Sequence, residues 1–272
     1  MDKKRGKKGV RPLFSESSRK GGFYNEREGM KGLILAAGIG KRLRPLTNSL
    51  PKALIPVAGR PMIEYSLRGF GRAGIGQVGI VVSPGEQGTV SERLGDGGQW
   101  DTQLTYIEQE KPLGTGDALA KAQGFVGEDN FLLAYCDLVS FYDFTKLIES
   151  HLKFRPLATL LINREESPET TGQVVWEGDL IKKIVEKPKD KISDYGISGL
   201  LIIEPDIFKA IPHIKPSAMG EYYIGDALQY LIDKKFEVRY QKIDTWRVNV
   251  NSLEDIKKAE ALILKNRSQK EL

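Results

Sequence analysis

Cysteine and histidine are scarce in this chain of 272 residues, and their scarcity excludes some classes of function. It has one cysteine, Cys136, and two histidines, His151 and His213. A lone cysteine excludes an intramolecular disulfide and suits a reducing compartment. So few cysteines and histidines also argue against a zinc site. Both histidines fall outside the motifs described below, and we predict that they lie on the surface.

Long apolar runs are also missing. None approaches the about 20 residues that a membrane-spanning helix needs, and the N-terminus lacks the apolar core of a secretory signal. The sequence therefore predicts a cytoplasmic protein with no membrane as a partner.

Positive charge is concentrated in residues 1–29. This segment has nine Lys or Arg residues against four acidic ones, which accounts for the whole formal net charge of +5. The remainder is balanced, so the pI near 9.0 does not indicate a basic binding surface, and nucleic acid is not expected as a partner. Two interpretations stay open. The segment is either a disordered extension upstream of a natural start at Met30, or a tail that solubilises the protein or touches nucleic acid.

Beyond Met30, predicted strands alternate with predicted helices. We expect strands at 32–37, 78–82, 104–107, 131–135, 158–162 and 197–203, a hairpin of 173–176 and 180–185, and helices at 61–73, 115–122, 144–152, 223–232 and 253–264. This alternation is typical of a mostly parallel sheet with helices on both faces. It predicts one Rossmann-like α/β domain over residues 30–266. Its halves, about 30–140 and 141–250, would face one cleft, with a C-terminal helix at 252–266 capped by Ser252.

The first predicted strand runs into a glycine-containing loop, LILAAGIGKRLRPL, over residues 33–46. Backbone N–H groups at Gly38 and Gly40 can surround phosphate oxygens at such a strand end. Positive charge follows directly, at Lys41, Arg42 and Arg44. The loop is neither a Walker A sequence nor the dinucleotide fingerprint, because the required Lys-Ser/Thr and third glycine are missing. On the glycines alone, a tight structural turn explains the loop equally well.

The continuation, PKALIPVAGRPMIEY over residues 51–65, adds Lys52, a second strand-like stretch and a turn at Gly59 into a helix. Residues 35–61 resemble the sugar-1-phosphate nucleotidyltransferase family, whose pattern is L-A-A-G-x-G-x-R-L-x-P-L-T followed by P-K-x-L-x-P-V-x-x-x-P. The resemblance implies the nucleotide-diphospho-sugar transferase fold. It also implies a reaction in which a sugar 1-phosphate attacks a nucleoside triphosphate and releases pyrophosphate. Such transfer needs alignment and charge compensation more than a nucleophilic side chain.

The same resemblance implies roles for matching residues on the nucleotide side. Arg42 and Lys52 would be catalytic cations on phosphate oxygens. The nucleotide would contact Leu35, Ala36, Ala37, Gly38 and Gly40. In the segment QEKPLGTGDAL (109–119), Gln109 would read a pyrimidine edge, and Gly114 and Thr115 would lie against the base. Thr115 is explained equally well as a helix cap.

Magnesium is the cofactor that the resemblance implies. Asp137 follows the strand FLLAY and matches a metal-binding aspartate, although Cys136 replaces the glycine that usually precedes it. A second ligand is expected at Asn249, within N-V-N-S-L-E-D, where most relatives carry D-V-G-T-P-E-D. An amide oxygen can coordinate Mg²⁺, but this substitution removes one negative charge from the site.

The sugar phosphate is expected at four further positions. Glu186-Lys187-Pro188 matches the family's E-K-P motif, with Glu186 on sugar hydroxyls and Lys187, a third catalytic cation, on the phosphate. Gly172 matches a glycine whose backbone contacts the sugar, and Ser198 matches a pocket position less closely. Exposed Glu-Lys pairs are common in hairpins, so this motif alone would not indicate a sugar-phosphate site. It does so here because it follows the earlier motifs at the spacing of the family.

These residues together predict an enzyme that forms an NDP-sugar and pyrophosphate. UTP or dTTP would be the nucleotide, and glucose 1-phosphate or N-acetylglucosamine 1-phosphate the acceptor. Two alternatives stay open, a cytidylyltransferase acting on inositol phosphate or phosphocholine, and a non-catalytic regulatory subunit of the same fold. Neither the sugar nor the oligomeric state follows from the sequence, and a homo-oligomer stays open.

Overall fold

The computed structural model describes residues 29–165 and 170–270, with side chains described as far as residue 266. Most of the basic segment 1–29 therefore lies outside the described residues. Within them, nine strands form one sheet in the order β5-β4-β1-β6-β11-β8-β12-β10-β9. Their bounds are β1 Lys31–Leu35, β4 Gln77–Val82, β5 Gln103–Glu108, β6 Phe131–Tyr135, β8 Ala158–Arg164, β9 Gly172–Glu177, β10 Leu180–Glu186, β11 Tyr195–Ile203 and β12 Val238–Lys242.

The sheet changes character at β6. Strands β5, β4, β1 and β6 pair in parallel. Beyond β6 the pairing is mixed, because β11 runs antiparallel to both β6 and β8, and β10 runs antiparallel to both β9 and β12. The parallel arrangement predicted for most of the sheet thus describes its first half. In the second half, a two-residue turn at 178–179 joins β9 to β10, and so short a connection permits only an antiparallel pair.

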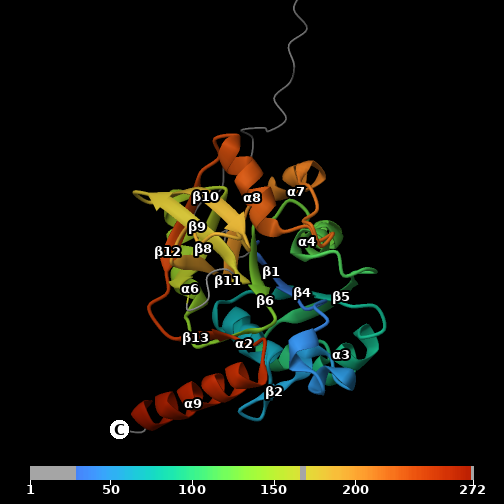
Figure 1. Cartoon of the computed structure of the whole chain (residues 1–272). Coiled ribbons are helices and arrows are strands. Elements are labelled where there is room, and N and C mark those ends of the chain that lie inside the picture. Colours follow the sequence, from blue (N-terminus) through green and yellow to red (C-terminus); the bar gives the residue numbers. More distant parts are fainter. Residues whose placement is uncertain (1–28, 166–169, 271–272) are drawn as a thin grey trace, which may run out of the picture.

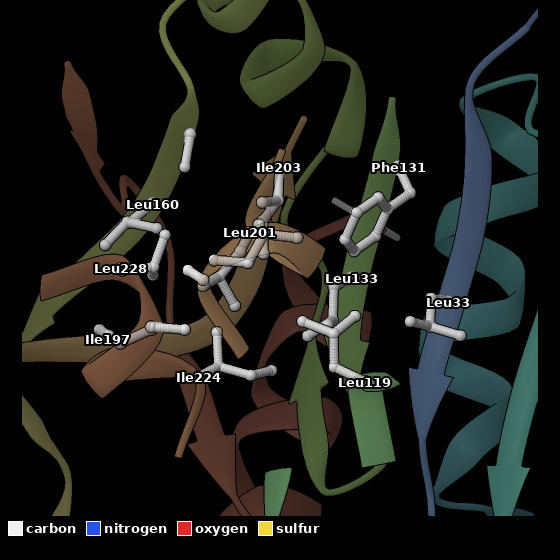
Figure 2. Packing of buried hydrophobic residues seen from close by; sticks show 14 of the residues in the cluster. Leu33, Leu119, Phe131, Leu133, Leu160, Ile197, Leu201, Ile203, Ile224 and Leu228 are labelled. Atoms are coloured by element: carbon white, nitrogen blue, oxygen red, sulfur yellow. The ribbon is translucent and has the colours of Figure 1, made fainter. Parts of the chain in front are cut away.

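Helices cover both faces of the sheet, as the alternation of elements predicts (Figure 1). One face carries α4 (Thr115–Lys121), α5 (Gln123–Val126), α7 (Ile207–Ala210) and α8 (Ile224–Asp233), and the other carries α2 (Ile63–Arg72), α3 (Gln87–Leu94) and α6 (Phe144–Phe154). Neighbouring side chains of β1 point to opposite faces of the sheet. Leu33 packs in the first layer, between the sheet and the helices α4, α5, α7 and α8, and Ile34 packs in the second layer, between the sheet and the helices α2, α3 and α6. Figure 2 shows the first layer, where side chains of β1, β6, β8 and β11 meet those of α4 and α8.

A smaller apolar cluster joins the N-terminal part of the domain to its C-terminal part. It contains Leu43, Ile55 and Val57 from the segments after β1, together with residues of β7 (Leu138–Ser140), β13 (Arg247–Asn249) and α9 (Leu253–Lys270). Helix α9 contributes Ala259 and Ile263, and it runs along one edge of the domain and away from the sheet (Figure 1). This cluster holds the loop after β1 against the C-terminal helix.

The start of α9 confirms the predicted cap. The backbone N–H of Asp255 donates to Ser252 Oγ at 3.2 Å, and Ser252 Oγ donates back to the Asp255 carboxylate at 2.9 Å. Ser252 therefore caps the helix, and Asp255 holds its hydroxyl in place. Among the described residues, no helix combines the length and apolar character that crossing a bilayer requires.

Three local expectations differ from the structure. After Lys52 the chain forms a 3-10 turn, Lys52–Leu54, and the two-residue strands β2 (Pro56–Val57) and β3 (Arg60–Pro61), since Pro56 lacks an N–H for a longer ladder. Helices α3, α5 and α7 and strands β7, β12 and β13 were not predicted, because their apolar patterns are short or weak. His151 is 1% exposed instead of lying on the surface, because it shares the inward face of α6 with Leu147.

The His151 ring is buried against β8. Its Nδ1 lies 3.0 Å from Thr159 Oγ1, and burial lowers the pKa of His151 to about 4. The ring therefore stays neutral near pH 7 and serves packing. His213 is exposed, as predicted, and stacks on Tyr230 with ring centroids 4.9 Å apart.

Two helical glycines provide a matched test of the packing. A Cβ at Gly71 of α2 would lie 2.0 Å from the carbonyl oxygen of Trp100, whereas a Cβ at Gly88 of α3 would meet nothing within 4 Å. Alanine favours a helix over glycine by about 0.5–1 kcal/mol, so Gly88→Ala should stabilise the protein. Gly71→Ala should lower the free energy of unfolding by about 1–3 kcal/mol through overpacking. Urea unfolding measures both, and equal effects would contradict the described contact between α2 and Trp100.

Candidate active site

Two adjoining cavities open where the parallel strands end. The first has a volume of about 590 Å³ and is lined by the loop after β1 and the segment around Gln109. The second has a volume of about 500 Å³ and is lined by the ends of β8, β10 and β13. Residues common to both linings are Arg42, Thr115, Tyr135, Asp137, Lys187, Tyr223 and Asn251. The carboxyl ends of parallel strands are where open α/β sheets bind ligands.

The loop after β1 lies at the first cavity as the sequence predicts. Leu35, Ala37, Gly38 and Gly40 line it, together with Lys41 and Arg42. Gly40 has φ of 65°, and a Cβ there would lie 2.9 Å from the Thr47 side chain and 3.2 Å from that of Lys52, so glycine suits this turn. The structure does not place Ala36 in either lining, because its side chain packs in the core. Its N–H continues the sheet by donating to the carbonyl of Val81 at 2.7 Å.

Lys52 reaches the boundary between the two cavities. Its Nζ donates to Asp137 Oδ2 at 2.6 Å and to Asn251 Oδ1 at 2.9 Å. Burial alone would lower the pKa of Lys52, but the charge of Asp137, the nearby Cys136 and the hydrogen bond to Asp137 together outweigh this effect and raise the pKa. Lys52 is only 8% exposed, and it is therefore a buried ammonium group at neutral pH.

Oxygen atoms suited to a hard cation lie beside this lysine. Asp137 Oδ1 and Asn249 Oδ1 are both buried, and neither has a hydrogen-bond partner within the protein. The pairing of β13 with β7 brings them together, since Asn249 lies opposite Leu138 and the Val250 N–H donates to the Asp137 carbonyl at 2.9 Å. Two protein oxygens fit Mg²⁺, which usually keeps waters and substrate phosphates in its shell. No set of three His, Cys, Asp or Glu side chains suits a metal in the described part of the chain.

Cys136 fits the turn between β6 and β7 without strain. It is absent from the non-glycine residues with positive φ in the described chain, so the glycine of relatives is not required for conformational reasons. Its N–H donates to the Leu35 carbonyl at 3.1 Å, extending the pairing of β6 with β1. Burial raises the pKa of the Cys136 thiol to about 12, and the thiol is neutral at physiological pH.

Gln109 is buried at the edge of the first cavity with a defined amide orientation. Its Nε2 donates to the Gly114 carbonyl at 3.1 Å and to Asp117 Oδ2 at 2.7 Å. Both partners only accept hydrogen bonds, so the amide nitrogen faces them, and Oε1 is the atom left for a ligand.

Thr115 is the first residue of α4 and does not cap it, since Gly114 takes the N-cap position. Its hydroxyl instead accepts from the Ile224 N–H at 3.1 Å. Nearby, the Gly116 N–H donates to the Tyr222 carbonyl at 2.8 Å. These bonds tie the predicted base-binding segment to residues 222–224.

Glu186 lies in the second cavity, facing Gly172 and Gly225. A Cβ at Gly172 would lie 2.9 Å from Glu186 Oε1, and one at Gly225 would lie 2.3 Å from it, so both positions leave room for the carboxyl group. Burial, followed by the nearby Asp226, raises the pKa of Glu186 to about 7, although Lys187 and the Gly225 N–H oppose the shift. Glu186 therefore titrates close to neutral pH.

Lys187 follows in a strained conformation, with φ of 42°. Its Nζ donates to the Tyr223 hydroxyl at 3.1 Å and lies 3.7 Å from Glu221 Oε2. Partial burial would lower the pKa of Lys187, but its contacts with Tyr223 and the nearby acids outweigh this effect and raise the pKa. Such strain in a non-glycine residue is typical of functional sites.

Ser198 does not reach the cavity. It is 0% exposed, and its hydroxyl donates to the Leu161 carbonyl at 2.8 Å, so the expected contact with the sugar phosphate is not available in this arrangement. Its neighbour Ile197 lines the second cavity instead. In a buried strand, adjacent side chains point to opposite faces of the sheet. A motif match at one position does not show which of two neighbouring residues faces the cavity.

Sequence reasoning missed a polar cluster in the second cavity. Arg247 Nε donates to Asn163 Oδ1 at 2.7 Å, and its Nη2 forms an ion pair with Glu165. These residues come from β13, β8 and the loop after β8, and they form no local pattern. Two residues that line both cavities, Asn251 and Tyr135, were also not chosen as candidates. The sequence shows Asn251 only as a departure from the glycine of the family pattern, and Tyr135 only as an aromatic residue before Cys136.

Comparison with known proteins agrees with this arrangement. The family model described as nucleotidyl transferase matches residues 31–265. The chain is 32% identical to the low-salt glycan biosynthesis nucleotidyltransferase Agl11 of Haloferax volcanii, over 89% of this chain and 68% of that protein. It is 34% identical to a glucose-1-phosphate thymidylyltransferase of Streptomyces griseus, over 86% of this chain and 66% of that protein.

A solved structure from Bacillus anthracis, assigned as a glucose-1-phosphate thymidylyltransferase in complex with a sucrose, superposes with a TM-score of 0.79. It is 31% identical to this chain, and the match covers 86% of this chain and 94% of that one. The chain therefore belongs to the nucleotidyl transferase family and has the fold of its sugar-1-phosphate nucleotidyltransferases.

Proposed function

We propose that this enzyme joins a pyrimidine nucleoside triphosphate, UTP or dTTP, to glucose 1-phosphate or N-acetylglucosamine 1-phosphate and releases pyrophosphate. The observation that carries the proposal is the position of Asp137. It lines both cavities, with one buried oxygen lacking a partner and the other bound to the ammonium of Lys52. Two phosphorylated substrates, one in each cavity, would meet at this point.

The first cavity suits the nucleotide. Backbone at Gly38 and Gly40 would surround the phosphates, as expected from the loop. The Oε1 of Gln109 would accept a hydrogen bond from the base, and uracil and thymine offer their ring N–H for this purpose. Gly114 and Thr115 line the same cavity and would lie against the base.

Charge compensation falls to three cations and a metal ion. Arg42 and Lys187 line both cavities, and Lys52 lies between them at the Asp137 carboxylate. An Mg²⁺ ion held by Asp137 and Asn249 would supply further positive charge to the phosphates. In such a site the protein aligns the sugar phosphate oxygen with the α-phosphorus and offsets charge, and no covalent intermediate is needed.

The second cavity suits the sugar. Glu186 would accept hydrogen bonds from hydroxyl groups, the backbone of Gly172 would lie against the ring, and Lys187 would bind the phosphate. The relatives named above as glucose-1-phosphate thymidylyltransferases support this substrate class. The division into a nucleotide half and a sugar half and a cytoplasmic location stay predictions, and a homo-oligomer stays open.

Pyrophosphate release tests the activity directly. The wild-type chain should release pyrophosphate with UTP or dTTP and a sugar 1-phosphate when Mg²⁺ is present. Asp137→Ala should lower kcat by about 100-fold or more, because an Mg²⁺ ion that would offset the developing phosphate charge loses its carboxylate ligand. Asp179→Ala, at the exposed β9–β10 turn, is the matched control.

The assay also separates the alternatives. The panel covers UTP, dTTP, CTP and GTP, each with sugar 1-phosphates, inositol phosphate and phosphocholine. A profile restricted to CTP would refute the nucleotide assignment. An Asp137→Ala rate equal to that of wild type would refute the catalytic role of this site, and no release with any pair would favour a regulatory subunit.

The raised pKa of Glu186 predicts a pH dependence. Below about pH 7 its carboxyl group is neutral, and above it the ionised form accepts hydroxyl hydrogen bonds more strongly. The kcat/KM for glucose 1-phosphate should therefore rise about tenfold between about pH 6 and pH 8. Glu186→Gln should remove this rise, while titration of the substrate phosphate would persist in the variant. Exposed Glu177→Gln should behave as wild type, and an unchanged profile in Glu186→Gln would contradict the assignment.

A further inference from the structure

Asn251 lines both cavities and contacts Lys52 at the boundary between them. Its Oδ1 accepts from Lys52 Nζ at 2.9 Å across 199 residues of sequence. We infer that Asn251 is a positioning residue that holds the Lys52 ammonium at the reaction centre when Asp137 engages a metal ion. The inference rests on the proposed function, and it concerns a position where the family pattern has glycine.

The Asn251 side chain has a defined orientation. Its backbone N–H donates to Asp255 Oδ2 at 2.9 Å, and its Nδ2 donates weakly to the Asn249 carbonyl at 3.4 Å. The amide nitrogen therefore faces the backbone of β13, and Oδ1 faces Lys52. Asp255 is itself bonded to Ser252, the residue that caps α9. The N-terminus of the last helix thus anchors the acceptor that Lys52 uses.

A neutral acceptor has a physical advantage at this position. Lysine has a flexible stem and three N–H donors, so its ammonium group needs fixed acceptors to stay in one place. A cation on Asp137 Oδ1 would compete with Lys52 for the negative charge of that carboxylate and weaken its bond to the ammonium group. Asn251 would still bind the ammonium, and because the amide carries no charge, the positive charge of Lys52 stays available for phosphate. A glycine here would provide no acceptor, and an aspartate would neutralise the lysine.

Triphosphate binding tests the coupling between the two residues. Binding of UTP and dTTP with Mg²⁺ is measured by calorimetry for wild type, Asn251→Ala, Lys52→Ala and the double variant. Asn251→Ala should weaken binding about tenfold, the effect of one hydrogen bond to a charged group. In the Lys52→Ala background the same change should have less than about a twofold effect. The KM for the sugar 1-phosphate should stay unchanged.

A second measurement needs no nucleotide. Acylation of Lys52 by an amine-reactive ester, followed by mass spectrometry, should be faster in Asn251→Ala, because its Nζ loses one of its two acceptors. Asn266→Ala is the matched control, since it removes an asparagine of α9 whose Nδ2 donates to the Leu262 carbonyl at 2.8 Å, away from the site. It should leave both the acylation rate and the triphosphate Kd within about twofold of wild type.

The outcomes separate this inference from the proposed function. An equal loss of binding from Asn251→Ala with and without Lys52, or an unchanged acylation rate, would show a merely structural asparagine and overturn the inference. A wild-type chain that binds UTP but releases no pyrophosphate with any acceptor counts against the proposed function alone. A wild-type chain that binds neither UTP nor dTTP overturns both.

Discussion

A buried ion pair between Lys52 and Asp137 brings together parts of the chain that are far apart in sequence. Removing two charges from water costs several kcal/mol per ion, so the pair is stable only where further polar contacts are in place. Asn251 supplies such a contact for the ammonium group. The ion pair therefore depends on the end of β6, the turn after Pro51 and the start of α9 being placed correctly at the same time.

The apolar cluster under α9 makes that placement possible. Leu43 and Ile55 come from the segments that carry Arg42 and Lys52, Val139 follows Asp137, and Val248 and Val250 flank Asn249. Each charged or polar group thus has an apolar neighbour within a single packed cluster. Close packing of this kind gives low compressibility, and it limits how far the polar groups can move relative to one another.

The two halves of the sheet contribute differently to the site. The parallel half delivers the ends of β1 and β6 to one edge, where their loops can surround phosphate. The mixed half returns the chain through the β9–β10 hairpin, so that Glu186 and Lys187 face the same edge from the other side. Hydrogen bonds between residues 113–116 and 222–224 connect the two halves across the cavities.

Local sequence determined the strand β1, the glycine loop after it, the β9–β10 hairpin and the capped C-terminal helix. The loop, the hairpin and the cap rest on interactions between residues close in the chain, which turn chemistry and capping report directly. The apolar run of β1 predicts a buried strand, although its pairing partners β4 and β6 are distant in the chain. The motif from Leu35 to Pro61 also determined the family, since a match at so many defined positions over this length is specific. Arg42, Lys52, Asp137 and Glu186 could be chosen as candidates on this basis.

Only the tertiary structure decided how those candidates are used. Ala36 and Ser198 face the core, the amide nitrogen of Gln109 is engaged by Asp117, and Arg247 joins Glu165 in the second cavity. The contact of Lys52 with Asn251 spans 199 residues, and no local pattern encodes it. Side-chain direction, burial and partner choice arise from packing between distant segments, and the free energy of a buried polar group depends on which partners that packing provides.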